Sequence, residues 1–243
     1  MKQSLFVALI TLILFSGCLT FERVPSIEEV LRAMEEVNEY QYEFHSANIG
    51  ITESETFTQI MKGGMNLKRR EGFEEIMTYN FDGELIEIYR AAVFDGRYYH
   101  YQLRKNKGEI LENITEENPL EAIVSSENIT TFIEDHFAWP LHTLSLFLKN
   151  GSVELIEKDG NLYVFRVEYS KERQGKYYEY IGNLTGIIWV NDALPVRFSL
   201  NITTITINLH SNITKRATSV VRGNITYSYL IPEWLLRIRK RSS

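Results

Sequence analysis

The chain has 243 residues, one cysteine, 44% hydrophobic residues and a formal net charge of −6. A mildly acidic protein is poorly suited to binding along a nucleic-acid backbone, so we expect no nucleic-acid partner. A single cysteine excludes an intramolecular disulfide, and the length fits one large domain.

The first residues have the order of a signal peptide. Lys2 precedes an apolar run over residues 5–15, and Ser16 and Gly17 place small side chains before Cys18. The run is shorter than the roughly 20 apolar residues that span a bilayer. We expect residues 1–17 to be a signal peptide; an uncleaved anchor and plain secretion are the alternatives.

Residues 15–18, with the sequence FSGC, resemble the lipobox of bacterial and archaeal lipoproteins, although Phe15 stands where leucine is most common. In those proteins the cysteine becomes the first mature residue and carries a lipid. Each buried CH₂ of such a chain contributes about 0.8 kcal/mol to anchoring. The resemblance implies lipidation of Cys18, a linker over residues 18–25, and a location on the extracytoplasmic face of the cell membrane.

Asn-x-Ser/Thr acceptors for N-glycosylation are more frequent than chance, which predicts about two from the composition. Their abundance predicts exposure to a glycosylation machinery outside the cell and, together with the lipobox, points to an archaeon. The alternative is that Asn-Ile-Thr triplets are ordinary strand composition. The seven acceptors are Asn113, Asn128, Asn150, Asn183, Asn201, Asn212 and Asn224.

The mature chain is predicted to begin with a helix. Ser26 and Glu29 form a capping-box pattern, and apolar residues follow at helical spacing as far as Val37. From Tyr40 the apolar period becomes two, which is typical of strands. Further strands are predicted at 56–62, 65–70, 73–80, 84–90 and 97–103, with turns at Gly63-Gly64, Asp82-Gly83 and Asp95-Gly96.

Residues 118–149 form a predicted helical insert, with short helices at 118–125, 130–137 and 140–149. This apolar stretch is long enough to cover a sheet. Strands then resume at 152–158, 162–169, 176–181, 184–191, 195–210 and 218–231. Because the apolar phase switches after Ile202, we expect a β-bulge near Thr203-Thr204.

Two segments carry a second resemblance: VFDGRYY at residues 93–99 and IWVNDALPVRF at 188–198. With the order helix, strands, helical insert, strands, they resemble the LolA-like fold of bacterial lipoprotein carriers and the LppX and LprG lipid-binding lipoproteins. The resemblance implies an α+β fold over 26–231, in which an N-terminal helix and the insert pack on a large curved antiparallel sheet. Such a sheet forms an unclosed half-barrel whose concave interior holds acyl chains.

The resemblance also implies a site. If the chain is similar, five residues of the insert face the sheet and line or plug the cavity. The alternative is that they form an ordinary filled core. They are Phe132, Phe137, Trp139, Leu144 and Phe147.

No catalytic or metal-binding motif stands out. The sequence lacks H-E-x-x-H, G-x-S-x-G, P-loop and Rossmann patterns. The six-residue spacing of His136 and His142 does not place them on one helical face, where a metal pair needs a spacing of four. We therefore expect no enzyme activity, metal or cofactor. The basic tail at 232–243 carries Trp234 and Leu236, and either packs on the domain or contacts a membrane surface.

Three functions remain. The favoured one is a lipid-anchored surface protein that binds or carries a lipid or acyl chain near the membrane. The second is a structural or interaction glycoprotein of the cell envelope with a fully packed core. The third is an envelope hydrolase with an unrecognised site. The sequence identifies no protein partner.

Overall fold

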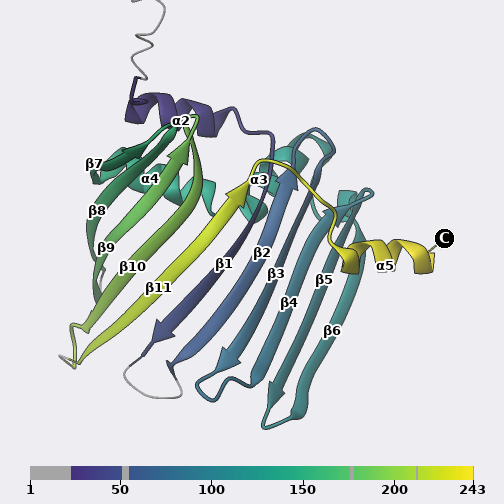
Figure 1. The fold of residues 1–243 in the computed structure, drawn as a ribbon. Helices are drawn as coiled ribbons and strands as arrows, with labels where there is room; N and C mark the ends of the chain where they lie inside the picture. Colours follow the sequence, from purple (N-terminus) through teal and green to yellow (C-terminus); the bar gives the residue numbers. More distant parts are fainter. Residues whose placement is uncertain (1–22, 51–54, 176–177, 212, 243) are drawn as a thin grey trace, which may run out of the picture.

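The computed structural model describes residues 23–50, 55–175, 178–211 and 213–242. In this part of the chain, antiparallel strands form one large open sheet with a few helices on its faces (Figure 1). The predicted fold class, α+β with a large unclosed antiparallel sheet, is confirmed.

The strands lie in the order β6-β5-β4-β3-β2-β1-β11-β10-β9-β8-β7, so the two halves of the sequence meet where β1 pairs with β11. Strands β6 and β7 are the two edges, and the segment between them therefore crosses the whole sheet. In chain order the strands are β1 (Glu39–Ile49), β2 (Phe57–Asn66), β3 (Glu71–Asn80), β4 (Leu85–Phe94), β5 (Arg97–Asn106), β6 (Glu109–Pro119), β7 (Ser152–Asp159), β8 (Leu162–Gln174), β9 (Tyr178–Asn191), β10 (Leu194–Asn208) and β11 (Thr214–Thr226).

Helix α2 (Ile27–Glu35) starts at the predicted capping box. The Glu29 amide donates to the Ser26 hydroxyl over 3.2 Å, and the Ser26 amide donates to the Glu29 carboxylate over 2.7 Å. Helices α3 (Ile129–Phe137) and α4 (Leu141–Asn150) confirm the two longer helices of the insert. The helix predicted at 118–125 is wrong, because β6 extends to Pro119 and two short 3₁₀ turns follow, Leu120–Ala122 and Ser126–Asn128.

Helices α2, α3 and α4 cover one face of the sheet, which we call the inner face, at one end of the strands (Figure 1). Alternate side chains of each strand point to this face. The core there includes Phe44 of β1, Ile188 of β9 and Phe198 of β10, each at most 3% exposed. Val30 of α2 and Leu144 of α4 are fully buried against them.

The turn predicted at Gly63-Gly64 is wrong, because both glycines lie inside β2 and pair with β1 and β3. The turn falls later, where Arg70 has a φ of 56°. A side chain at Gly63 would overlap the ring of Tyr42, and one at Gly64 would approach the backbone of β1 within about 3 Å. The two glycines therefore allow Tyr42 and the backbone of β1 to pack closely against β2.

The bulge predicted at Thr203-Thr204 is also wrong. Strand β10 pairs without interruption through these residues, and its irregularity lies at Pro195. The change of apolar phase is real, and it turns Ile205 and Ile207 to the outer face. The inner face there carries threonines, because no helix covers this end of the strand.

Three other boundaries differ from the predictions. The strands predicted at 176–181 and 184–191 correspond to one strand, β9, which begins at Tyr178 and continues through to Asn191. Strand β11 runs from Thr214 to Thr226 and not from 218 to 231. The edge strand β6 was not predicted, because its exposed surface leaves no alternation of apolar residues.

The C-terminal segment crosses to the outer face and ends in α5 (Glu233–Ser242), which begins at the β6 side of the sheet and extends past this edge in Figure 1. Leu235 is fully buried in a second apolar cluster, and Trp234 packs beside it with the Arg90 guanidinium 5.4 Å from its ring. The apolar side of this helix therefore packs on the domain.

Candidate functional site

The end of α3 and the start of α4 place an aromatic group against the centre of the sheet. The ring of Trp139 lies 4.0 Å from Phe44, 5.9 Å from Tyr42 and 6.0 Å from Phe198. Phe137 lies on Gly72 of β3, where a side chain would overlap its ring. The glycine thus lets α3 approach β3 closely.

The five residues implied by the resemblance all belong to the packing between insert and sheet. Phe137, Leu144 and Phe147 are buried, whereas Phe132 and Trp139 are half-buried. Phe132 packs against Tyr98 of β5, and Phe147 against Tyr169 of β8, with ring centroids 6.0 and 5.6 Å apart. These residues pack between the helices and the sheet. Trp139 also lines a pocket of about 490 Å³ between α2 and the insert, and Phe147 borders the open groove described below.

A row of polar groups crosses the inner face beside this core. Tyr42 extends over Gly63 toward Glu74 of β3, and its hydroxyl faces that carboxylate without a well-formed hydrogen bond. Burial raises the pKa of Glu74, an effect that the Tyr42 hydroxyl partly offsets. Burial likewise raises the pKa of Tyr89 to about 12, and that of Tyr98 in the same direction. Neutral forms are therefore favoured in this row.

Beyond the helices the inner face is hollow. A pocket of about 340 Å³ lies over β8, β9 and β10 at the end of α4, and a second of about 310 Å³ continues across β10, β11, β1 and β2. Thr204 borders both, and we call the pair the distal groove. Figure 1 shows these ends of the strands without a covering helix. The side chains that define the distal groove are Phe147, Tyr169, Lys171, Arg173, Tyr180, Leu184, Ile202, Thr204, Asn48, Glu55, Phe57, Thr206, Lys215 and Ala217.

The part of the groove nearest the helices is apolar. Leu184 is 4% exposed and Phe147 8% exposed, and Tyr169 and Ile202 lie beside them, half-buried. Gly182 lies in the floor, and a side chain there would meet no atom closer than 3.8 Å. The groove combines an apolar wall with open space, which suits a small apolar molecule.

Two larger hollows, of about 730 and 720 Å³, flank the C-terminal segment on the outer face. Charged side chains border them and pair with each other. Lys62 lies 3.2 Å from Glu43, and Arg90 lies 2.6 Å from Glu75. These surfaces are less suited to an apolar ligand than the distal groove.

Six of the seven glycosylation acceptors lie in the described residues, and all six are exposed. Asn183, Asn201 and Asn224 lie on the outer face, as the register with Thr203, Thr185 and Glu43 shows. Asn113 lies on the edge strand β6, and Asn128 and Asn150 flank α3 and α4. Cys18 and Asn212 lie outside the described residues.

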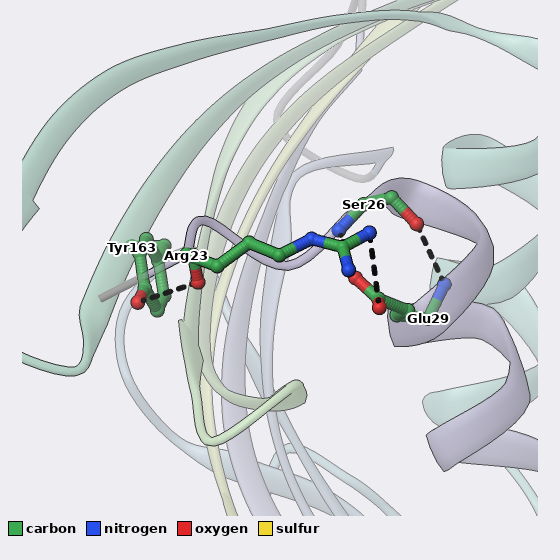
Figure 2. Close-up of polar contacts among 4 residues, drawn as sticks. All are labelled: Arg23, Ser26, Glu29 and Tyr163. Carbon is green, nitrogen blue, oxygen red and sulfur yellow. Dashed lines mark hydrogen bonds and ion pairs between the residues drawn. The ribbon is translucent and has the colours of Figure 1, made fainter. Parts of the chain in front are cut away.

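The N-terminal segment is held against the helical end of the sheet (Figure 2). The Tyr163 hydroxyl of β8 donates to the Arg23 carbonyl over 3.3 Å, and the Arg23 guanidinium lies 3.5 Å from Glu29. The hydrogen bond from the Ser26 amide, with Arg23 nearby, lowers the pKa of Glu29. Among the helices of the described residues, none has the length and hydropathy needed to cross a bilayer.

The histidines of the insert do not converge. His136 uses Nδ1 to contact the Phe132 carbonyl at 2.8 Å and stacks on its ring, whereas His142 is exposed on α4. Within the described ranges, no group of three or more His, Cys, Asp or Glu side chains is placed to hold a metal ion.

No protein-family model matches the sequence, and no curated protein is similar to it. Among solved structures, a DUF1329 family protein from Desulfovibrio piger aligns over 85% of this chain and 93% of its own, with 9% identity and a TM-score of 0.28. A match at this level carries no functional argument, and the fold class rests on the strands and helices described above.

Sequence reasoning missed the distal groove. The strand predicted at 162–169 ends just before Lys171 and Arg173, although the alternation of residues continues to Gln174. That continued alternation was the available signal, and it places both cations on the same face as Tyr169.

Proposed function

We propose that this protein is a lipid-anchored lipoprotein on the extracytoplasmic face of the membrane that binds or carries a lipid or acyl chain in the distal groove. It is a binding protein with a LolA-like half-barrel, and no chemical step is required of it. The observation that carries the proposal is the uncovered inner face beyond the helices, with Phe147, Leu184 and Ile202 as its apolar wall. An apolar concave surface left in water favours an apolar occupant.

The signal peptide and the lipobox at Cys18 support the location, and the exposed acceptor asparagines are compatible with a glycosylated surface. The short linker after Cys18 would keep the helical end of the domain at the membrane. The filled core under α3 and α4 limits the proposed site to the open end of the sheet.

The first experiment is mass spectrometry on the protein purified from its native membrane. We expect a lipid on Cys18 and a second, non-covalent lipid released on denaturation. A photoactivatable fatty acid added to those membranes should label β8 to β10 near Ile202, and labelling confined to the outer face would contradict the proposed site.

The filled core favours the second candidate, a structural or interaction glycoprotein of the envelope. Its signature in the same experiment is a modified Cys18 with no bound lipid and no labelling of the groove. An unmodified Cys18 still joined to residues 1–17 would overturn the lipoprotein assignment.

A further inference from the structure

The distal groove changes in character along β8. Tyr169 pairs with Leu184 next to the helices, Lys171 pairs with Gly182 one step further out, and Arg173 pairs with Tyr180 near the end of the strand. Paired residues point to the same face, so the groove is apolar at its helical end and cationic at its open end.

Among the residues that the structure describes, neither cation has an acidic partner on the inner face. Lys171 and Arg173 form no ion pair with any described residue, and their neighbour Glu172 alternates to the outer face. Elsewhere along the groove the inner-face charges are Lys215 and Glu55, which lie 3.7 Å apart. The groove is therefore locally positive in a chain whose formal net charge is −6.

Gly182 leaves the space between the cations and the apolar wall open. A side chain there would meet nothing nearer than the Lys171 carbonyl at 3.8 Å, and its other neighbour across the sheet is Thr204. An extended molecule can thus lie along the floor from Phe147 and Tyr169 to the ammonium of Lys171.

We propose that the ligand of the distal groove is a single-chain amphiphile with an anionic head, a carboxylate or a phosphate. Its tail lies against Phe147, Tyr169, Leu184 and Ile202, and its head lies between Lys171 and Arg173. This inference rests on the proposed function and names its ligand class. The guanidinium of Arg173 suits a two-point contact with either head group, and the Lys171 ammonium adds a point charge.

The exposure of Lys171 and Arg173 to solvent limits how much the head group can add to the affinity. Both cations are exposed, so solvent and salt screen each charge contact, which limits its contribution. We expect the anionic head to improve affinity about tenfold over a neutral head, and the preference to weaken with rising salt.

The test compares ligands that differ only in their heads. The full chain carrying Cys18→Ser, which lacks the thiol for a lipid anchor, is titrated below the aggregation limit with dodecanoate, dodecyl phosphate and 1-dodecanol. We expect dodecanoate and dodecyl phosphate to bind about tenfold more tightly than dodecanol. Acetate and inorganic phosphate carry the anionic head groups without an alkyl tail, and neither should displace dodecanoate.

The decisive variant combines Lys171→Glu and Arg173→Glu. It should lose the preference for anionic heads and keep the affinity for dodecanol. The charge-matched control combines Lys68→Glu and Lys149→Glu, two exposed cations outside the groove, and should keep the preference.

Three results would overturn the inference alone, and a fourth would overturn the proposed function with it. Equal binding of dodecanoate and dodecanol by the unmodified groove removes the head-group site but leaves the proposed function. An equal loss in the control pair assigns the preference to overall charge. Displacement by inorganic phosphate alone identifies a free-anion site. If dodecanol and dodecanoate both fail to bind, the proposed function itself fails.

Discussion

Gly182 offers a way to fill the distal groove without disturbing the fold. Its φ lies outside the left-handed region, and the nearest atom to an added Cβ is 3.8 Å away. A glycine inside a strand costs about 0.5–1 kcal/mol relative to alanine, and aromatic residues favour strands. Gly182→Phe should therefore leave the free energy of unfolding unchanged or raise it by up to about 1 kcal/mol.

The same substitution should displace the ligand. The ring occupies the space of a stretch of tail on the order of four methylenes, and each buried CH₂ contributes about 0.8 kcal/mol. The loss is then about 3 kcal/mol, or roughly 100-fold in affinity. Displacement of a fluorescent fatty acid measures the affinity, and urea unfolding measures the stability.

Gly182→Ala is the matched control, because a methyl group leaves most of the groove open. We expect it to bind within a few-fold of the unsubstituted chain. If Gly182→Phe binds the fatty acid normally and remains stable, the ligand lies elsewhere and the reasoning is refuted. If Gly182→Phe unfolds readily, the floor of the groove is not open.

Three further predictions concern the frame around the groove. Gly186→Ala, four residues closer to the helices along β9, should cost about 1–3 kcal/mol in urea unfolding, because its Cβ would lie 2.5 Å from Leu200 and 2.8 Å from the Ser199 carbonyl; a neutral result would contradict that close approach. Ser26→Ala should cost about 1 kcal/mol by removing the cap of α2, and Ser26→Asp should restore most of it. Burial raises the pKa of Glu74 in the folded chain, so stability should fall as pH rises from the ordinary value of 4.5 through the folded pKa. Glu74→Gln should remove that component and exceed the parent in stability only above this window, whereas an unchanged pH profile would show that Glu74 is well solvated.

Local signals predicted much of the fold. Ser26 and Glu29 place the start of α2, and the insert helices follow from Pro140, the apolar spacing and Asn150-Gly151. Period-two patterns predict most strands, since each has one face against a core. Those signals depend only on neighbours in sequence.

The incorrect predictions concern segments whose local structure is determined by residues distant in sequence. Gly63-Gly64 has the sequence of a turn, but in the structure Tyr42 from the neighbouring strand packs over Gly63. The sequence predicts that Ile205 and Ile207 lie in the core, but the sheet extends past the helices that cover it, and both residues lie beyond them. The distal groove was missed for the same reason. The aromatic residues of the insert can be recognised in the sequence. The uncovered part of the sheet is defined by where the covering helices end in the structure, which the sequence does not reveal.

The hydrogen bond from Tyr163 to the Arg23 carbonyl limits how far the domain can lie from a lipid on Cys18. Only five residues lead from Cys18 to Arg23, and fully extended they cover at most about 18 Å. A lipid on Cys18 would thus keep the helical end of the sheet next to its own bilayer. Ile202 lies eight residues along β10 from Leu194, about 25 Å further out. The open end of the sheet, with the distal groove, would then lie on the side away from the bilayer. Under the proposed function, a ligand must therefore reach the groove from a partner or a second surface above the membrane, or the domain must tilt toward its own bilayer.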